Sequence, residues 1–212
     1  MKKAVLATAN PGKLREIRQL LSGLPLALSA QSEHGLSGAD EVGATFIENA
    51  LLKARHAAAA TGLAAIADDS GLEVDILGGA PGIHSARYAG PGAGDADNRA
   101  KLMRALAAAG GEGEGEGGGK KFPARFRCVA VFLPAAMHPA PLVAEGVWHG
   151  FVRARAEGEG GFGYDPVFFV PQKNCSAAQL SAADKNQLSH RARAFGELKQ
   201  RLAAAGAILS SP

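Results

Sequence analysis

The chain has 212 residues, 47% hydrophobic and 20% charged, which suits one globular α/β domain with a sizeable core. The formal net charge of +3 is too small to indicate a nucleic-acid-binding protein. No apolar run is long enough to cross a membrane or to serve as a signal peptide. Cys128 and Cys175 lack the spacing of a metal site and predict thiols in a reducing compartment. We therefore expect a cytoplasmic protein without a nucleic-acid or membrane partner.

The first half of the chain predicts alternating strands and helices. Residues 4–7 and 24–30 predict strands. Between them, Asn10 is a good N-cap and Pro11 a good first residue for a helix. Thr45 and Glu48 have the spacing of a capping box, which predicts a helix to about Thr61.

The second half continues this pattern. Asp97 is expected to cap a helix over residues 98–109, and residues 110–119 (GGEGEGEGGG) predict a flexible surface loop. Further strands are predicted at residues 125–133, 142–155 and 167–170. A second capping signal begins at Ser181, and Ser189 is expected to cap a final helix to about Ala205. No break demands a second domain, so we expect residues 1–212 to form one.

Two adjacent carboxylates, Asp68 and Asp69, directly follow the apolar run of residues 63–67. The run predicts a buried strand that Ser70 and Gly71 close with a turn, so both carboxylates are expected where ligand crevices of α/β sheets open. Two anions this close repel each other, and a divalent cation removes that problem. Mg²⁺ or Mn²⁺ suits oxygen ligands, and Mg²⁺ usually takes one or two carboxylates plus substrate phosphates. For this motif alone, a solvated turn is an open alternative.

Three further segments carry polar groups that suit a nucleotide. The strand-to-helix turn of residues 8–13 directs backbone N–H groups outward and adds the cation of Lys13, which favours phosphate, although it is not a P-loop. Residues 160–166 place glycines around Phe162, which offers a stacking face. Lys185, His190 and Arg191 predict an anion or base-edge site near the last helix. Taken singly, these segments also fit a capped helix start, a glycine-rich hairpin and a solvated basic face.

Together, these segments resemble one family, the inosine triphosphate pyrophosphatases, also called dITP/XTP diphosphatases. The matching segments come in the family's order: LATANPGK (6–13), TFIENALLKARHAA (45–58), ADDSGLEVDILGGAPGIHSARYAG (67–90), GGFGYDPVFFVP (160–171) and LSHRARA (188–194). The family usually has glycine where Ala9 stands, and the glycine-glutamate insert is unlike most members.

The resemblance implies a mixed α/β fold with a long central sheet flanked by helices, two lobes with the active cleft between them, and a homodimer. It implies Mg²⁺-dependent hydrolysis of ITP, dITP, XTP or dXTP to the monophosphate and pyrophosphate, which cleanses the nucleotide pool; Mn²⁺ is a substitute metal. Asp69 is then the catalytic carboxylate and a metal ligand, Glu41 a further metal ligand, and Asp68 a supporting residue. The implied substrate contacts are Thr8, Ala9, Asn10, Pro11, Gly12, Lys13, Ser70, Phe162, Gly163, Tyr164, Asp165, Lys185, His190 and Arg191.

Two other functions compete with this hypothesis. A nucleotide-sensing module would bind the same ligands without turnover, but extra carboxylates are unfavourable in a pure binder of anions. A pyrophosphatase for modified pyrimidine triphosphates would share the chemistry and differ in the base. A comparison of dITP with dUTP and dCTP separates these enzymes.

Overall fold

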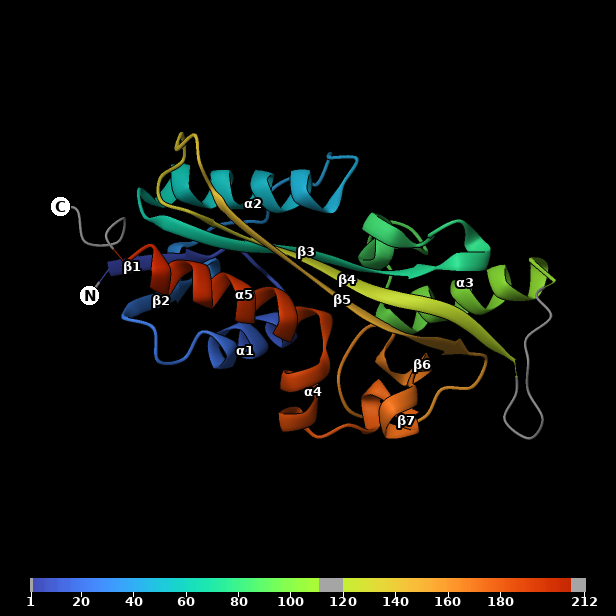
Figure 1. Cartoon of the computed structure of the whole chain (residues 1–212). Helices are drawn as coiled ribbons and strands as arrows, with labels where there is room; N and C mark the ends of the chain where they lie inside the picture. The colour runs from blue at the N-terminus through green and yellow to red at the C-terminus, as the bar shows by residue number, and fades with distance from the viewer. Residues whose placement is uncertain (1, 111–119, 207–212) are drawn as a thin grey trace. The chain divides into compact units, whose positions relative to one another are not determined.

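A computed structural model describes residues 2–110 and 120–206 of the chain. Its strands form a seven-stranded sheet in the order β2-β1-β3-β4-β5-β6-β7 (Figure 1). The strands are β1 (Lys2–Leu6), β2 (Leu26–Ala30), β3 (Ala64–Val74), β4 (Lys121–Leu133), β5 (Leu142–Arg153), β6 (Phe168–Val170) and β7 (Cys175–Ser176). β1 pairs in parallel with β2 and β3, whereas β6 is antiparallel to β5 and β7. The predicted α/β fold with a mixed sheet is confirmed.

The chain divides into two compact units. The first comprises residues 1–69, 128–146 and 190–212, and the second comprises residues 70–127 and 147–189. The prediction of one domain stays a prediction. Apart from Gly110, the predicted flexible loop lies outside the described residues. Within the described ranges, no helix has the length and apolar character needed to cross a membrane.

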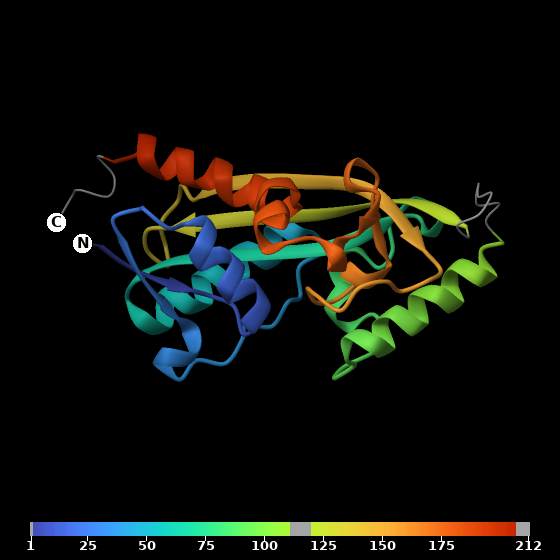
Figure 2. The same ribbon diagram turned by 90° about the horizontal axis from the view of Figure 1, so that it is seen from below.

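In the first unit, helices cover both faces of the strands. Figures 1 and 2 place α2 (Phe46–Thr61) on one face, and α1 (Pro11–Leu20) beside α5 (His190–Ala204) on the other. The predicted helix starts are confirmed: the Asn10 side chain accepts a hydrogen bond from the Lys13 amide, and Thr45 and Glu48 form the capping box. α2 ends at Gly62, whose left-handed φ of 67° suits glycine.

The core of the first unit lies between the strands and the pair α1 and α5. Ile17 of α1 and Phe195 of α5 are buried there with Leu6 and Ile66 from β1 and β3. Gly146 of β5 allows the close approach of α5, because a Cβ at this position would lie 2.1 Å from the His190 carbonyl oxygen. This packing fixes the start of α5 against the sheet.

The second unit contains α3 (Asp95–Ala108) and α4 (Ala182–Leu188). Its core includes Phe126, Trp148 and Phe168, whose ring centroids lie 4.6–6.3 Å apart. The predicted start of α3 was wrong: the helix begins at Asp95 after Gly94. Asp97 instead accepts a hydrogen bond from the Gly94 amide, from inside the first turn of the helix. The predicted cap of α4 at Ser181 is confirmed.

The predicted end of β3 was also wrong. The strand continues through Asp68, Asp69, Ser70 and Gly71 to Val74, so the carboxylates lie inside it and not at its end. Gly71 serves a close approach and not a turn, because a Cβ there would lie 2.1 Å from the Gly82 carbonyl oxygen and 2.6 Å from Ser85 Oγ. The Ser85 hydroxyl also accepts a hydrogen bond from the Leu72 amide, and this bond holds the strand extended.

Candidate active site

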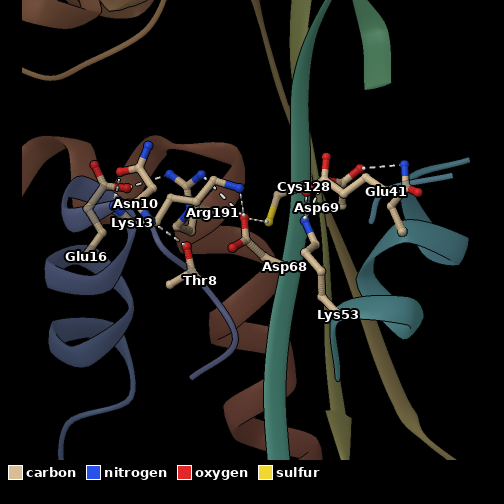
Figure 3. Close-up of polar contacts among 11 residues, drawn as sticks. Thr8, Asn10, Lys13, Glu16, Glu41, Lys53, Asp68, Asp69, Cys128 and Arg191 are labelled. Carbon is tan, nitrogen blue, oxygen red and sulfur yellow. Dashed lines mark hydrogen bonds and ion pairs between the residues drawn. The ribbon is translucent and has the colours of Figure 1, made fainter. Parts of the chain in front are cut away.

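Asp68 and Asp69 point to opposite faces of β3, because side chains alternate along a strand. Figure 3 shows Asp68 directed toward Lys13 and Arg191, and Asp69 directed toward Lys53. α1 and α5 supply the first two cations, and α2 supplies the third. The two carboxylates are therefore neutralised separately, which replaces the expected shared divalent cation as the answer to their mutual repulsion.

On the Asp68 side, the charged side chains form a network of ion pairs. Lys13 Nζ lies 3.0 Å and Arg191 Nη2 3.5 Å from Asp68 Oδ2, while Arg191 Nη1 donates to Glu16 Oε2 at 2.6 Å. Burial acts to raise the pKa of Asp68, but the charges of Lys13, Arg191 and Lys53 outweigh burial and hold this pKa well below its usual range. Asp68 therefore stays ionised as the counter-ion of two cations.

Arg191 and a thiol complete this network. Burial acts to lower the pKa of Arg191, but the carboxylates of Asp68 and Glu16 raise it, so the guanidinium stays charged. The Cys128 thiol donates to Asp68 Oδ2 at 3.8 Å. Burial, together with the charge of Asp68, raises the pKa of Cys128 and keeps it a neutral thiol. Asp68 Oδ1 is buried and has no hydrogen-bond partner among the described residues.

The Asp69 side carries an excess of carboxylates. Lys53 Nζ lies 2.7 Å from Asp69 Oδ1 and 2.9 Å from Glu41 Oε1, and Asn49 Nδ2 lies 3.5 Å from Asp69 Oδ2. Burial raises the pKa of Asp69 despite the opposing charges of Lys53 and Lys13. Burial acts to lower the pKa of Lys53, but Asp69, Asp68 and Glu41 together raise it. The Lys53 ammonium is thus the shared partner of Asp69 and Glu41. Because the pKa of Asp69 is raised, its carboxylate binds a proton more readily than an ordinary aspartate does.

The donor set on this side fits Mg²⁺. Glu41 and Asp69 both reach the single ammonium of Lys53, so their oxygens can share one cation. No group of three or more His, Cys, Asp or Glu side chains is arranged for a metal within residues 2–110 and 120–206. Mg²⁺ takes one or two protein carboxylates and completes its shell with water and substrate phosphates, so the pair Glu41 and Asp69 has the chemistry to hold it.

The predicted phosphate turn of residues 8–13 lies at the start of α1. Thr8 Oγ1 accepts the Asn10 amide at 3.2 Å, and Asn10 Oδ1 accepts the Lys13 amide at 3.0 Å. Ala9, Asn10 and Pro11 are exposed, whereas the Lys13 side chain is 16% exposed and is held by Asp68. The turn and the carboxylates predicted from separate motifs are therefore brought together within the first unit.

In the second unit, residues 160–165 form a loop around one carboxylate. Asp165 Oδ2 accepts the Phe162 amide at 2.9 Å and Lys185 Nζ at 2.6 Å. The Lys185 ammonium also lies 4.8 Å from the centroid of the Phe162 ring. Tyr164 is buried, and its hydroxyl donates to the Ser85 carbonyl oxygen at 2.8 Å. Ser70 lies half-buried in β3.

The predicted group of Lys185, His190 and Arg191 is assigned to two units. Lys185 pairs with Asp165 in the second unit. His190 and Arg191 begin α5 in the first unit, and both are buried. The structure therefore gives Lys185 and Arg191 different carboxylate partners.

Sequence reasoning missed four residues of the first-unit network: Glu16, Asn49, Lys53 and Cys128. A signal existed for Asn49 and Lys53, which share one face of α2 at a spacing of four. Glu16 lies three residues after Lys13, again on one helix face. The missing information was the position of their partners, which lie on β3 for Asn49, Lys53 and Cys128 and on α5 for Glu16.

Residues 4–201 match the model of the Ham1 family. This chain belongs to the Ham1 family. A Ham1 protein from Coxiella burnetii has a similar structure, with a TM-score of 0.86 and 42% identity over 96% of this chain and 100% of that one. The Ham1 protein of Staphylococcus aureus has a TM-score of 0.80 and 38% identity over the same shares.

Two curated relatives of this Ham1 chain carry an enzyme name. A dITP/XTP pyrophosphatase of Photorhabdus laumondii subsp. laumondii is 53% identical over 200 residues, 92% of this chain and 95% of the relative. One from Vibrio parahaemolyticus is 54% identical over 204 residues, 96% of this chain and 98% of the relative. The family resemblance inferred from the five sequence segments is confirmed.

Proposed function

We propose that this chain hydrolyses non-standard purine nucleoside triphosphates, namely dITP, ITP, XTP and dXTP, to the monophosphate and pyrophosphate. The observation that carries the proposal is the pair Asp68 and Asp69, each held by its own lysine, in a Ham1 chain. The names of the relatives support the substrate class. Removal of these nucleotides would cleanse the nucleotide pool.

Asp69 is the proposed general base. Its raised pKa gives the carboxylate more affinity for a proton than an ordinary surface aspartate has, and this favours removal of a proton from the attacking water. Lys53 orients Asp69 through the 2.7 Å contact at Oδ1. Lys13 and the turn of residues 8–12 are proposed to bind the triphosphate, where the fixed charge of Lys13 stabilises the pyrophosphate leaving group.

Glu41 and Asp69 are the proposed ligands of Mg²⁺, with Mn²⁺ as a substitute. Bound there, the ion supplies charge neutralisation for the phosphate oxygens and a lower pKa for water. The Lys53 ammonium holds these two carboxylates close together. Through the same contacts, the Lys53 ammonium would compete with a metal ion for Glu41 and Asp69. We therefore expect Lys53 to give up one of these two ion pairs in the metal-bound protein.

The base is proposed to stack on Phe162, with Gly163, Tyr164, Asp165 and Lys185 shaping its surroundings. His190 and Ser70 stay predicted substrate contacts. The contacts of Arg191 with Asp68 and Glu16 favour a supporting role, in which it keeps Asp68 ionised, over a direct role in base recognition. The homodimer and the cytoplasmic location also stay predictions.

A pyrophosphate-release assay tests this function. Purified chain with Mg²⁺ is expected to release pyrophosphate from dITP and dXTP far faster than from dATP, dGTP, dUTP or dCTP. Binding of dITP without release would favour the sensing module, and preference for dUTP or dCTP would favour the pyrimidine enzyme. Release of single phosphate groups would contradict cleavage at the α-phosphorus.

A further inference from the structure

Both polar atoms of the Gly163 backbone are held by one helix. The Gly163 amide donates to Asp95 Oδ2 at 2.6 Å, and Arg99 Nη1 donates to the Gly163 carbonyl oxygen at 2.7 Å. Asp95 and Arg99 lie four residues apart in α3, so they share one face of the helix.

Gly163 is a point where the loop of residues 160–165 needs support. Its φ is +63°, a left-handed conformation that residues other than glycine rarely adopt. Gly161 also has a positive φ, of +74°, and Gly160 is a third glycine of the loop. Because glycines lose more freedom on folding than other residues, contacts that fix the backbone of this loop contribute to its order.

Gly163 lies between two residues whose side chains have different tasks. On its C-terminal side, Tyr164 is buried and bonded to the Ser85 carbonyl oxygen. On its N-terminal side, Phe162 is only half-buried, with the Lys185 ammonium 4.8 Å from its ring centroid. The Phe162–Gly163 peptide carries the amide that Asp95 binds, so rotation of this peptide would move the Phe162 ring, while Tyr164 stays anchored.

We propose that Asp95 and Arg99 are positioning residues that fix the backbone of Gly163, through the peptide groups on either side of it, and thereby hold the Phe162 ring ready to stack on a purine base. This inference rests on the proposed function. Neither side chain needs to touch the nucleotide. Their effect is preorganisation: a loop that is already ordered loses less freedom when the base binds.

The test compares Asp95→Ala and Arg99→Ala with Asp97→Ala. Asp97 is the matched control for Asp95. It lies in the same turn of α3 and carries the same charge as Asp95, but it accepts a hydrogen bond from the Gly94 amide and not from Gly163. We expect the KM for dITP to rise by about three- to tenfold in both test variants, with kcat within about twofold of wild type. The inhibition constant of inorganic triphosphate, which has no base, should not change.

Two further variants separate positioning from general damage to the fold. Asp95→Asn keeps an acceptor oxygen and Arg99→Lys keeps a donor, so each should recover part of the loss. Because both residues fix the backbone of one glycine, the double alanine variant should be little worse than the worse single one. Thermal melting verifies that each variant is folded.

Specific outcomes overturn the inference. Test variants with the same KM as Asp97→Ala would overturn it, and so would a parallel rise in the inhibition constant of inorganic triphosphate. These results would leave the proposed function intact, because wild type would still hydrolyse dITP. Wild type without dITP hydrolysis would instead overturn the proposed function and this inference with it.

Discussion

Asp68 and Asp69 are one position apart in β3, and that step places them in opposite electrostatic surroundings (Figure 3). Asp68 faces Lys13 and Arg191, which hold its pKa low, whereas Asp69 shares Lys53 with Glu41 and has a raised pKa. A carboxylate bound by two cations acts as an anchor, and one whose ionised form is disfavoured can accept a proton. Adjacent identical residues thus acquire different roles from the helices that cover each face.

The largest expected effect concerns Asp69. Asp69→Asn should lower kcat for dITP by about a hundredfold or more, because the amide cannot act as a general base. Its stability should equal or exceed that of wild type, since burial opposes the ionised form of Asp69 and Lys53 keeps Glu41 as a partner. Pyrophosphate release and denaturant unfolding measure the two quantities.

The control for this variant lies on the same strand. Glu73→Gln makes the same change of charge in β3, but Glu73 pairs with Arg125 and Arg127 and has no role in the proposed chemistry. It should retain the activity of wild type. Near-normal dITP hydrolysis by Asp69→Asn would remove Asp69 from the role of base.

Substitution of Asp68 should lower stability more, and activity less, than substitution of Asp69. Asp68→Asn leaves Lys13 and Arg191 without their shared counter-ion, and loss of one partner from a buried ion pair costs about 3–5 kcal/mol. We expect the lower end, about 3 kcal/mol, because Arg191 keeps Glu16 and Lys13 is partly exposed. Activity should fall by about ten- to a hundredfold, as for residues that orient others.

Urea unfolding of Asp68→Asn beside Asp69→Asn measures this difference. Equal stability of the two variants would contradict the division between an anchor and a base. So would a larger activity loss in Asp68→Asn than in Asp69→Asn.

Local signals gave correct predictions because their causes lie within a few residues. The starts of α1, α2 and α4 follow from side chains that accept hydrogen bonds from backbone amides three positions away, as with Asn10, Thr45 and Ser181. The paired carboxylates were also found from sequence, because two adjacent aspartates after an apolar run are unusual in themselves.

The errors at β3 and the residues missed in the first-unit network have tertiary causes. Ser70 and Gly71 have the composition of a turn, but Gly82 and Ser85 approach Gly71 so closely that the strand continues. The role of Lys53 depends on which strand lies opposite its face of α2, which helix periodicity does not reveal. The partnership of Glu16 with Arg191 joins residues 175 positions apart.

The smallest expected effect is the pH dependence of stability. The lowered pKa of Asp68 contributes stability that is complete above the unfolded carboxyl pKa of about 3.9 and is lost as pH falls through the lower folded pKa. Wild type should therefore exceed Asp68→Asn in stability at neutral pH, with the gap narrowing below about pH 4.

Asp69 should give the opposite sign, because its pKa is raised in the folded state. Its carboxyl group favours folding most fully below the unfolded pKa and loses that contribution as pH rises through the folded pKa. Asp69→Asn should therefore match wild type in acid and equal or exceed it at neutral pH. Unfolding free energies of the three proteins from pH 3 to 7 measure both gaps. If wild type were more stable than both variants at neutral pH, or less stable than both, the two faces of β3 would not differ in the way that their charges indicate.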